Sequence, residues 1–213
     1  MIIGIDEAGR GPIIGPMVVA GVAIEDSLLD KLKDKGVRDS KALSRKSREK
    51  LFYEIVEIAS AFSVVKVQPQ EIDLNNLNSL TYQAVNKIIS SMLYLKPNRV
   101  TVDKVGRETE VIVYLKLLGI EANVVHQADV NFVECSAASI IAKVIRDKEI
   151  DKIKEKYGDV GSGYPSDEKT INWISKIHEK GEPPPPFLRR SWKILNRIAP
   201  NYYLEKGGSG VGN

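Results

Sequence analysis

The sequence predicts an α/β fold in which a mixed five-stranded sheet is flanked by helices and followed by a small C-terminal helical lobe. Three observations predict this fold. Short apolar segments rich in β-branched residues dominate the first part of the chain, which favours antiparallel strands. Helical and strand-like segments then alternate, which favours parallel strands joined by helical crossovers. Beyond residue 165 the remaining patterns are helical.

The first two strands are predicted at residues 2–5, which end in Asp6-Glu7, and at residues 16–24. The link between them is rich in glycine and proline and is too short to hold a helix. A dinucleotide-binding fingerprint requires a glycine loop that opens a helix, and its glycines have a different spacing. The sequence therefore excludes that kind of site.

A helix is predicted at residues 45–60, because apolar residues recur at helical spacing after Ser44, a suitable N-cap. Residues 61–67 alternate loosely and are predicted to form the third strand. A second helical pattern covers residues 71–95, and Pro97 ends it.

Two more strands follow with helices between and after them. Residues 99–103 form a short apolar segment that ends in Asp103, and residues 121–126 form the fifth predicted strand. A helix at 108–118 separates them. Asp129 comes shortly after the fifth strand. Acidic residues therefore follow the fourth and fifth predicted strands, as Asp6 and Glu7 follow the first.

A long helix is predicted at residues 134–157, with Gly158 at its end. The tail adds predicted helices at 167–180 and 191–198, and it finishes in a Gly/Ser-rich stretch that is predicted to be disordered. The predicted units are a main domain at 1–164, a C-terminal helical lobe at 165–206 and a disordered tail at 207–213.

The composition excludes several classes of protein. With 43% hydrophobic and 28% charged residues, the 213-residue chain is too apolar for a disordered protein. It has no apolar stretch long enough to cross a membrane and no signal-peptide pattern. Cys135 cannot form an internal disulfide, and no Cys/His cluster could hold zinc. We expect a cytoplasmic protein whose net charge of +3 permits an anionic partner without requiring one.

Four acidic residues lie at or beyond strand ends: Asp6, Glu7, Asp103 and Asp129. An aspartate at a strand end is ordinarily a turn or capping residue. If strands one, four and five are parallel neighbours, however, these carboxylates converge and repel one another unless a cation lies between them. Oxygen ligands select Mg²⁺ or Mn²⁺, and two such ions can serve phosphoryl transfer. The pattern alone leaves a nuclease and a generic Mg²⁺ phosphotransfer site open.

Several segments resemble the motifs of the ribonuclease HII family, the type 2 ribonucleases H, in their archaeal version. The resemblance follows the family's order of motifs and covers nearly the whole chain to about residue 200. The matching segments are DEAGRGP at 6–12, DSK at 39–41, VD at 102–103, SAASIIAKVIRD at 136–147, GYPS at 163–166 and RRSWK at 189–193.

This resemblance implies a ribonuclease H-like fold and endonucleolytic cleavage of RNA in RNA–DNA hybrids. It also implies incision 5′ of ribonucleotides embedded in duplex DNA, by two-metal-ion catalysis with Mg²⁺ or Mn²⁺ that leaves 3′-hydroxyl and 5′-phosphate ends. By motif position, the catalytic metal ligands are Asp6, Glu7, Asp103 and Asp129.

Asp147 competes with Asp129 for the role of the fourth acid. Asp129 is preferred because it follows a strand end and matches the family's acid upstream of the long helix. Many relatives have a proline before that helix, where this chain has Val133, so the helix start is less firmly fixed.

The resemblance also assigns substrate-binding residues. Gly9, Arg10 and Gly11 match the segment that reads the ribonucleotide, and the same glycines could simultaneously serve a tight hairpin link. Tyr164 matches the tyrosine that stacks on the following deoxyribose, or it could simply pack at the junction with the lobe. The candidates for phosphate contacts are Lys41, Ser139 and Lys143.

The predicted partners are RNA–DNA hybrid and duplex DNA that contains ribonucleotides. No membrane partner is predicted, and the protein is expected to be a monomer. No sliding-clamp box is evident near the C-terminus, so no clamp is predicted. The alternatives are another ribonuclease H-like nuclease of the resolvase or transposase type, a non-catalytic nucleic-acid-binding module, and a Mg²⁺ phosphohydrolase for small molecules.

Overall fold

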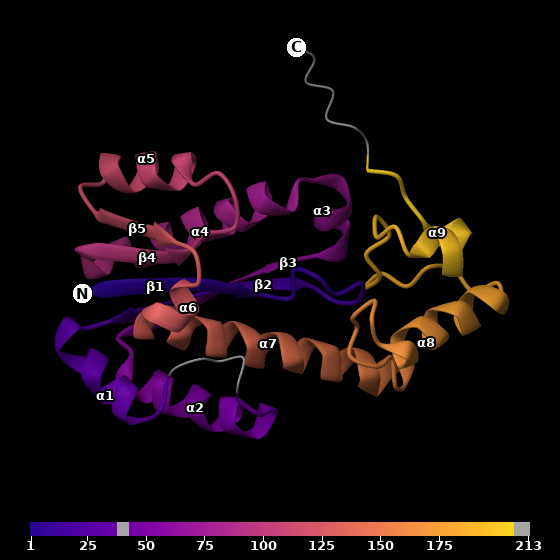
Figure 1. Cartoon of the computed structure of the whole chain (residues 1–213), viewed down its shortest axis with the longest axis horizontal. Helices are drawn as coiled ribbons and strands as arrows, with labels where there is room; N and C mark the ends of the chain where they lie inside the picture. The colour runs from indigo at the N-terminus through magenta and orange to yellow at the C-terminus, as the bar shows by residue number, and fades with distance from the viewer. Residues whose placement is uncertain (38–42, 207–213) are drawn as a thin grey trace, which may run out of the picture.

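The structure is a computed structural model that describes residues 1–37 and 43–206. One central sheet carries helices on both faces, and the C-terminal helices lie beyond one end of it (Figure 1). Lys41, the DSK segment and the predicted disordered tail lie outside the described residues. Within them, the helices are too short or too polar to cross a membrane.

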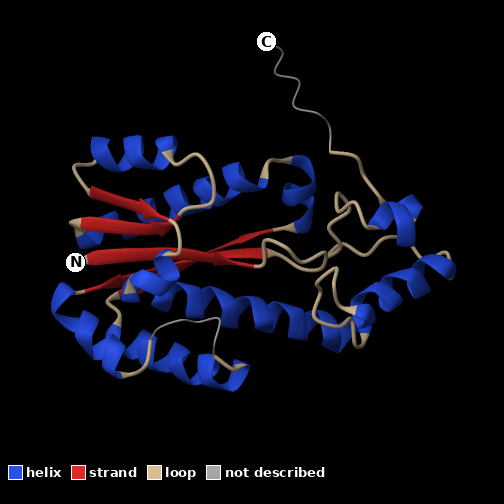
Figure 2. Ribbon diagram, in the orientation of Figure 1, coloured by secondary structure: helices blue, strands red, loops and turns tan. Residues whose placement is uncertain are grey.

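The sheet has the predicted mixed, five-stranded architecture, with strand order β3-β2-β1-β4-β5 (Figure 2). β1 is antiparallel to β2 and parallel to β4, while β2 and β3 are antiparallel and β4 and β5 are parallel. Ile5 is aligned with Val102, so the residues that follow them, Asp6 and Asp103, lie at the same edge. The strands are β1 (Ile2–Ala8), β2 (Met17–Ile24), β3 (Ala61–Val67), β4 (Arg99–Asp103) and β5 (Glu121–Val125).

One face of the sheet is covered by α7 (Val133–Tyr157), with α1 (Leu29–Asp34) and α2 (Arg45–Ile58) outside it (Figure 1). The long helix lies unusually close to β1. A Cβ on Gly4 would lie 2.2 Å from the carbonyl carbon of Glu134, so no side chain fits there. This close approach brings the SAAS segment of α7 next to the carboxyl end of β1.

The opposite face is covered by α3 (Pro69–Leu74), α4 (Leu77–Met92) and α5 (Thr109–Leu117). The single helix predicted at 71–95 was wrong, because the chain is extended at Asn75. Asn76 then caps a new helix by accepting hydrogen bonds from the backbone amides of Asn78 and Ser79.

Three other elements differ from prediction. α1 and the single-turn α6 (Ala128–Asn131) were not predicted, since each is too short to show a helical period. The helix predicted at 191–198 is reduced to α9 (Leu195–Ile198), which is followed by a 3₁₀ turn, η3 (Pro200–Tyr202). Short 3₁₀ turns also occur at η1 (Asp26–Leu28) and η2 (Leu93–Leu95).

The C-terminal elements, α8 (Glu168–Glu179) and α9, pack around their own apolar cluster. That cluster includes Ile13 and Ile14, which belong to the link between β1 and β2. The amides of both isoleucines donate to the Gly163 carbonyl, at 2.7 and 3.2 Å. The link is thus held between the main sheet and the C-terminal part of the chain, although the predicted boundary at residue 164 stays a prediction.

Candidate active site

Three of the four predicted acids meet at the edge of the sheet where the parallel strands end. Carboxylate oxygens of Asp6, Glu7 and Asp103 all lie within 4.8 Å of one another. Asp6 is buried near the carboxyl end of β1, and Asp103 is the last residue of β4. The parallel pairing of these strands therefore explains why acids that are far apart in sequence share one site.

Backbone amides fix the direction of two of these side chains. The Glu7 amide donates to Oδ1 of Asp6 at 2.8 Å, and the Ala128 amide donates to Oδ1 of Asp103 at 2.9 Å. The second bond ties the end of β4 to the start of α6, whose second residue is Asp129. The geometry of the cluster is therefore set by the sheet edge and by α6 together.

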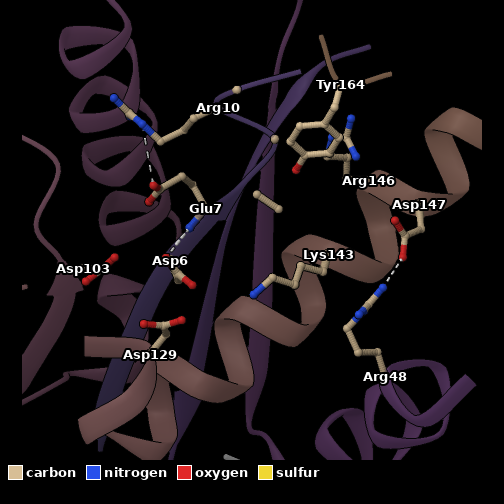
Figure 3. Close-up of a pocket in the computed structure, with 13 residues that line it drawn as sticks. Asp6, Glu7, Arg10, Arg48, Asp103, Asp129, Lys143, Arg146, Asp147 and Tyr164 are labelled. Atoms are coloured by element: carbon tan, nitrogen blue, oxygen red, sulfur yellow. Dashed lines mark hydrogen bonds and ion pairs between the residues drawn. The ribbon is translucent and has the colours of Figure 1, made fainter. Parts of the chain in front are cut away.

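Asp129 is buried on α6, and its backbone carbonyl accepts a hydrogen bond from the Ser136 hydroxyl of α7. Its side chain points toward Asp6 (Figure 3), and its charge contributes to raising the pKa of Asp6. Asp147 instead lies across the groove, where it pairs with Arg48 at 3.0 Å. The position of Asp129, and not that of Asp147, is next to the acid cluster.

Burial and mutual repulsion make this cluster unfavourable in its fully ionised form. Burial is the main cause that raises the pKa of Asp6 to about 7 and that of Glu7 to about 8. Neighbouring carboxylates add to both shifts, whereas Arg10, 3.9 Å from Glu7, opposes the shift at Glu7. Hard oxygen donors gathered in this way fit divalent cations such as Mg²⁺ or Mn²⁺.

Ser139 and Lys143, two of the predicted phosphate contacts, lie on α7 beside this cluster. The Lys143 ammonium donates to the Ser139 hydroxyl at 2.8 Å. A hydrogen bond between Ser139 and Asp6 favours the ionised carboxylate and so opposes the rise in the pKa of Asp6. The structure thus connects both residues to the acid cluster, while their contact with phosphate stays a prediction.

The acids line one end of a groove of about 520 Å³. The rest of its lining includes the side chains of Arg48, Lys143, Arg146, Asp147 and Tyr164 (Figure 3). The Gly9–Gly11 segment forms part of its wall. A groove with an acid cluster at one end and cationic side chains such as Lys143 and Arg146 beside it suits an anionic polymer whose reacting group meets a cation.

A larger residue at the first position of the Gly9–Gly11 link would strain the backbone and displace a neighbouring side chain. Gly9 has a φ of 85°, and a Cβ there would lie 2.4 Å from the Cδ and Nε atoms of Arg146. The side chain of Arg10 turns to α4, where Nη1 donates to the Thr81 hydroxyl at 2.7 Å and Nη2 donates to Asn78. That guanidinium is already engaged, so we expect the backbone of the link to meet a substrate.

Tyr164 lies beside this link with 42% of its surface exposed. A Cβ built on Gly11 would be 3.7 Å from its ring, and the Arg146 guanidinium lies 5.4 Å from the ring centroid. Arg146 is almost fully buried, and this burial lowers its pKa. The contacts of Arg146 with Gly9 and Tyr164 were not predicted, because no local pattern indicates which face of a long helix supports a distant loop.

Comparisons with known proteins identify the family of the chain. Residues 3–195 match the family model of ribonuclease HII. A ribonuclease HII from Saccharolobus solfataricus is 60% identical over 208 residues, which cover 98% of each chain. The crystal structure of ribonuclease H2 from Pyrococcus horikoshii OT3 has a TM-score of 0.82 at 38% identity and covers 94% of this chain and 98% of that one.

A further structure, of the RNase HII in a PCNA complex from Archaeoglobus fulgidus, has a TM-score of 0.82 at 40% identity. It covers 93% of this chain and 96% of that one. The fold is therefore of the ribonuclease H type, as the motifs implied. The chain belongs to the ribonuclease HII family, and it is a metal-dependent endoribonuclease that acts on the RNA of RNA–DNA hybrids.

Proposed function

We propose that this endoribonuclease also incises duplex DNA on the 5′ side of a single embedded ribonucleotide, leaving 3′-hydroxyl and 5′-phosphate ends. One observation carries the proposal. The acid cluster, the Gly9–Gly11 link and the Tyr164 ring all line the same groove. A duplex whose scissile phosphate lies at the acids would therefore present its neighbouring sugars to the link and the ring.

Recognition of one ribonucleotide requires close contact with a single 2′-hydroxyl, which can both donate and accept a hydrogen bond. The absence of side chains at Gly9 and Gly11 lets backbone groups approach that sugar. Tyr164 is assigned to the next sugar, where its half-exposed ring would stack on a deoxyribose. A second 2′-hydroxyl at that position would crowd the ring, so the junction from RNA to DNA is favoured.

The proposed cofactors are two divalent cations, Mg²⁺ or Mn²⁺, held by Asp6, Glu7, Asp103 and Asp129. When bound, they would lower the pKa of the attacking water and offset negative charge on the leaving 3′ oxygen. The chain itself holds the acids in place through the Glu7 and Ala128 amides. The reaction is then a direct hydrolysis that needs no protein nucleophile.

Ser139 and Lys143 of α7 are proposed to bind the phosphate backbone. Lys143 and Arg146 line the groove on the same helix, and Ser139 lies one turn from Lys143. Lys41 is proposed for the same role on the strength of its motif. Contacts of this kind supply affinity and register without reading the base sequence.

A panel of labelled duplexes tests the proposal. It contains an all-DNA duplex, a continuous RNA–DNA hybrid and a duplex with one ribonucleotide, each with Mg²⁺, with Mn²⁺ and with EDTA. We expect metal-dependent cleavage of the hybrid and a single cut 5′ of the lone ribonucleotide, with a 3′-hydroxyl that a polymerase can extend. An intact one-ribonucleotide duplex beside a cleaved hybrid would refute the proposal, and cleavage of all-DNA would favour a resolvase-type nuclease.

For partners, we propose that the enzyme acts as a monomer on these nucleic acids, and the sequence predicts no sliding-clamp partner. The relative from Archaeoglobus fulgidus was solved in a complex with PCNA, so this part of the proposal needs its own assay. Size-exclusion chromatography of the chain with PCNA should show two separate peaks, and co-elution would overturn it.

A further inference from the structure

Two side chains from the C-terminal part of the chain hold successive carbonyl groups of the Gly9–Gly11 link. Nη2 of Arg189 donates to the Gly9 carbonyl at 2.6 Å, and Nη1 donates to the Arg10 carbonyl at 3.0 Å. Nε1 of Trp192 donates to the Gly11 carbonyl at 3.0 Å. All the carbonyls of the predicted ribonucleotide-reading segment are therefore engaged from one side.

These bonds determine where the amides of the link point. The described residues contain no cis peptide bond, and in a trans peptide the C=O and N–H groups point in opposite directions. The amides of Arg10 and Gly11 share peptide planes with the two carbonyls that Arg189 holds, so both amides point away from Arg189. Within the described part of the chain, neither amide donates to a protein acceptor. Both residues line the groove.

The Arg189 side chain is fixed by burial and by further contacts, so it can orient the carbonyl groups that it binds. It is fully buried, its Nε donates to the Gly15 carbonyl at 2.8 Å, and its guanidinium stacks 5.1 Å from the Trp192 ring. Burial, with a smaller effect of the Arg146 charge, lowers the pKa of Arg189 to about 9. Burying a cation is costly unless its donors are satisfied, and here backbone carbonyls satisfy them.

The segment that carries Arg189 and Trp192 is itself fixed to the main domain through Asp73 of α3. The Asp73 carboxylate accepts the amides of Arg190 and Ser191, each at 2.9 Å, and the Ser191 hydroxyl at 2.8 Å. The two carbonyl-binding side chains are therefore anchored on both sides, by α3 and by the C-terminal apolar cluster.

We propose that Arg189 and Trp192 are positioning residues for ribonucleotide recognition. They fix the peptide planes of the link so that the Arg10 and Gly11 amides are presented to the sugar and phosphate of the ribonucleotide. The inference rests on the proposed incision at embedded ribonucleotides, and it assigns to the C-terminal lobe a part in specificity. Neither side chain is required to touch the substrate.

The test compares the two tryptophans of the chain. Trp192→Phe keeps an aromatic face against Arg189 but removes the N–H that binds the Gly11 carbonyl. Trp173→Phe is the matched control, because Trp173 lies in the same lobe, packs on Phe187 with ring centroids 5.8 Å apart and makes no hydrogen bond to the link in the described structure. Dissociation constants are measured in EDTA by fluorescence anisotropy, for a one-ribonucleotide duplex and an all-DNA duplex of the same sequence.

For Trp192→Phe, we expect the dissociation constant of the one-ribonucleotide duplex to rise about three- to tenfold, the range for one hydrogen bond. Binding of the all-DNA duplex should change less than about twofold on the same scale. Trp173→Phe should leave both constants unchanged. With Mg²⁺, kcat/KM of Trp192→Phe on the one-ribonucleotide duplex should fall by the same factor as its affinity.

An equal loss for both duplexes, or no loss for the one-ribonucleotide duplex, would overturn the inference. A wild-type enzyme that leaves the one-ribonucleotide duplex uncut contradicts the proposed function instead, so the two failures are distinguishable. Arg189→Lys is a second variant that keeps the charge but cannot reach several carbonyls at once. If it folds, it should show a larger loss with the same dependence on the ribonucleotide, and if it does not, Trp192→Phe decides.

Discussion

Gly9 combines an unusual backbone conformation with a close packing contact, and the two effects can be measured separately. Gly9 and Gly36 both have a φ of 85°. Among residues 1–37 and 43–206, a Cβ at Gly36 would meet nothing within 4 Å, whereas one at Gly9 would meet Arg146. We expect Gly36→Ala to lower the free energy of unfolding by roughly 1–2 kcal/mol through backbone strain alone. Gly9→Ala should lower it by about 1–3 kcal/mol more, because the added methyl group overpacks against Arg146.

Urea unfolding of both variants measures these free energies of unfolding. Equal destabilisation would show that Arg146 moves aside at little cost and that the contact behind the link is loose. The Gly9 variant should also lose cleavage activity even where it remains folded, since Arg146 also supports Tyr164.

Among single residues, the sequence was most informative for the acids and least informative for the arginines. The placing of Asp6 and Asp103 follows from parallel strand ends, which hydrophobic patterns indicate. Arg189 would be taken for a surface charge, yet it is fully buried against carbonyls 174 to 180 positions away. A long charged side chain carries no local signal of such a partner.

At the level of elements, the break between α3 and α4 depends on Asn76. Its side chain accepts hydrogen bonds from the Asn78 and Ser79 amides at 2.9 and 3.2 Å. We expect Asn76→Ala to lower the free energy of unfolding by about 0.5–2 kcal/mol through the loss of this cap. Asn201→Ala is a suitable control, because Asn201 is exposed and its side chain makes no hydrogen bond within residues 1–37 and 43–206.

Chemical denaturation of the two variants measures the difference in their free energies of unfolding. Because Asn78 also binds the Arg10 side chain, fraying of α4 should loosen that contact, and activity should fall together with stability. Identical stability of the two variants would mean that tertiary packing alone starts α4.

Elements were predictable where a periodic pattern is long or where a cap is a single strong residue. The five strands and the long helix α7 were predicted within a few residues of their observed ends. The break at Asn75 was missed because apolar residues continue at nearly helical spacing on both sides of it. α6 was missed although it carries Asp129, since one turn leaves no period to detect.

For the whole molecule, the buried acids should make stability depend on pH and on metal together. The folded state raises the pKa of Asp6 to about 7 and of Glu7 to about 8, above ordinary values of about 4. The folded state then binds protons more tightly than the unfolded state. The free energy of unfolding of the metal-free protein should therefore fall as pH rises from about 5 to about 8.

Divalent cations bind the ionised carboxylates, so Mg²⁺ or Mn²⁺ should restore stability most strongly at the alkaline end of this range. Melting temperatures at several pH values, with EDTA and with each ion, measure the effect. Asp6→Asn should show a weaker dependence on both pH and metal. A melting temperature that rises with pH in EDTA, or that does not change when Mg²⁺ or Mn²⁺ is added, would contradict the predicted effect of the buried acids.

Cleavage of an RNA–DNA hybrid by Asp103→Asn under single-turnover conditions, with melting temperature measured on the same sample, is the most direct test of the site. Asparagine keeps an oxygen for the Ala128 amide but removes one negative charge from the cluster. We predict a rate at least about 100-fold below wild type in Mg²⁺, a melting temperature that is not lowered, and no cleavage by wild type in EDTA. A folded variant that cuts at nearly the wild-type rate would remove Asp103 from the catalytic residues. It would contradict the claim that the acid cluster is the metal-dependent catalytic site.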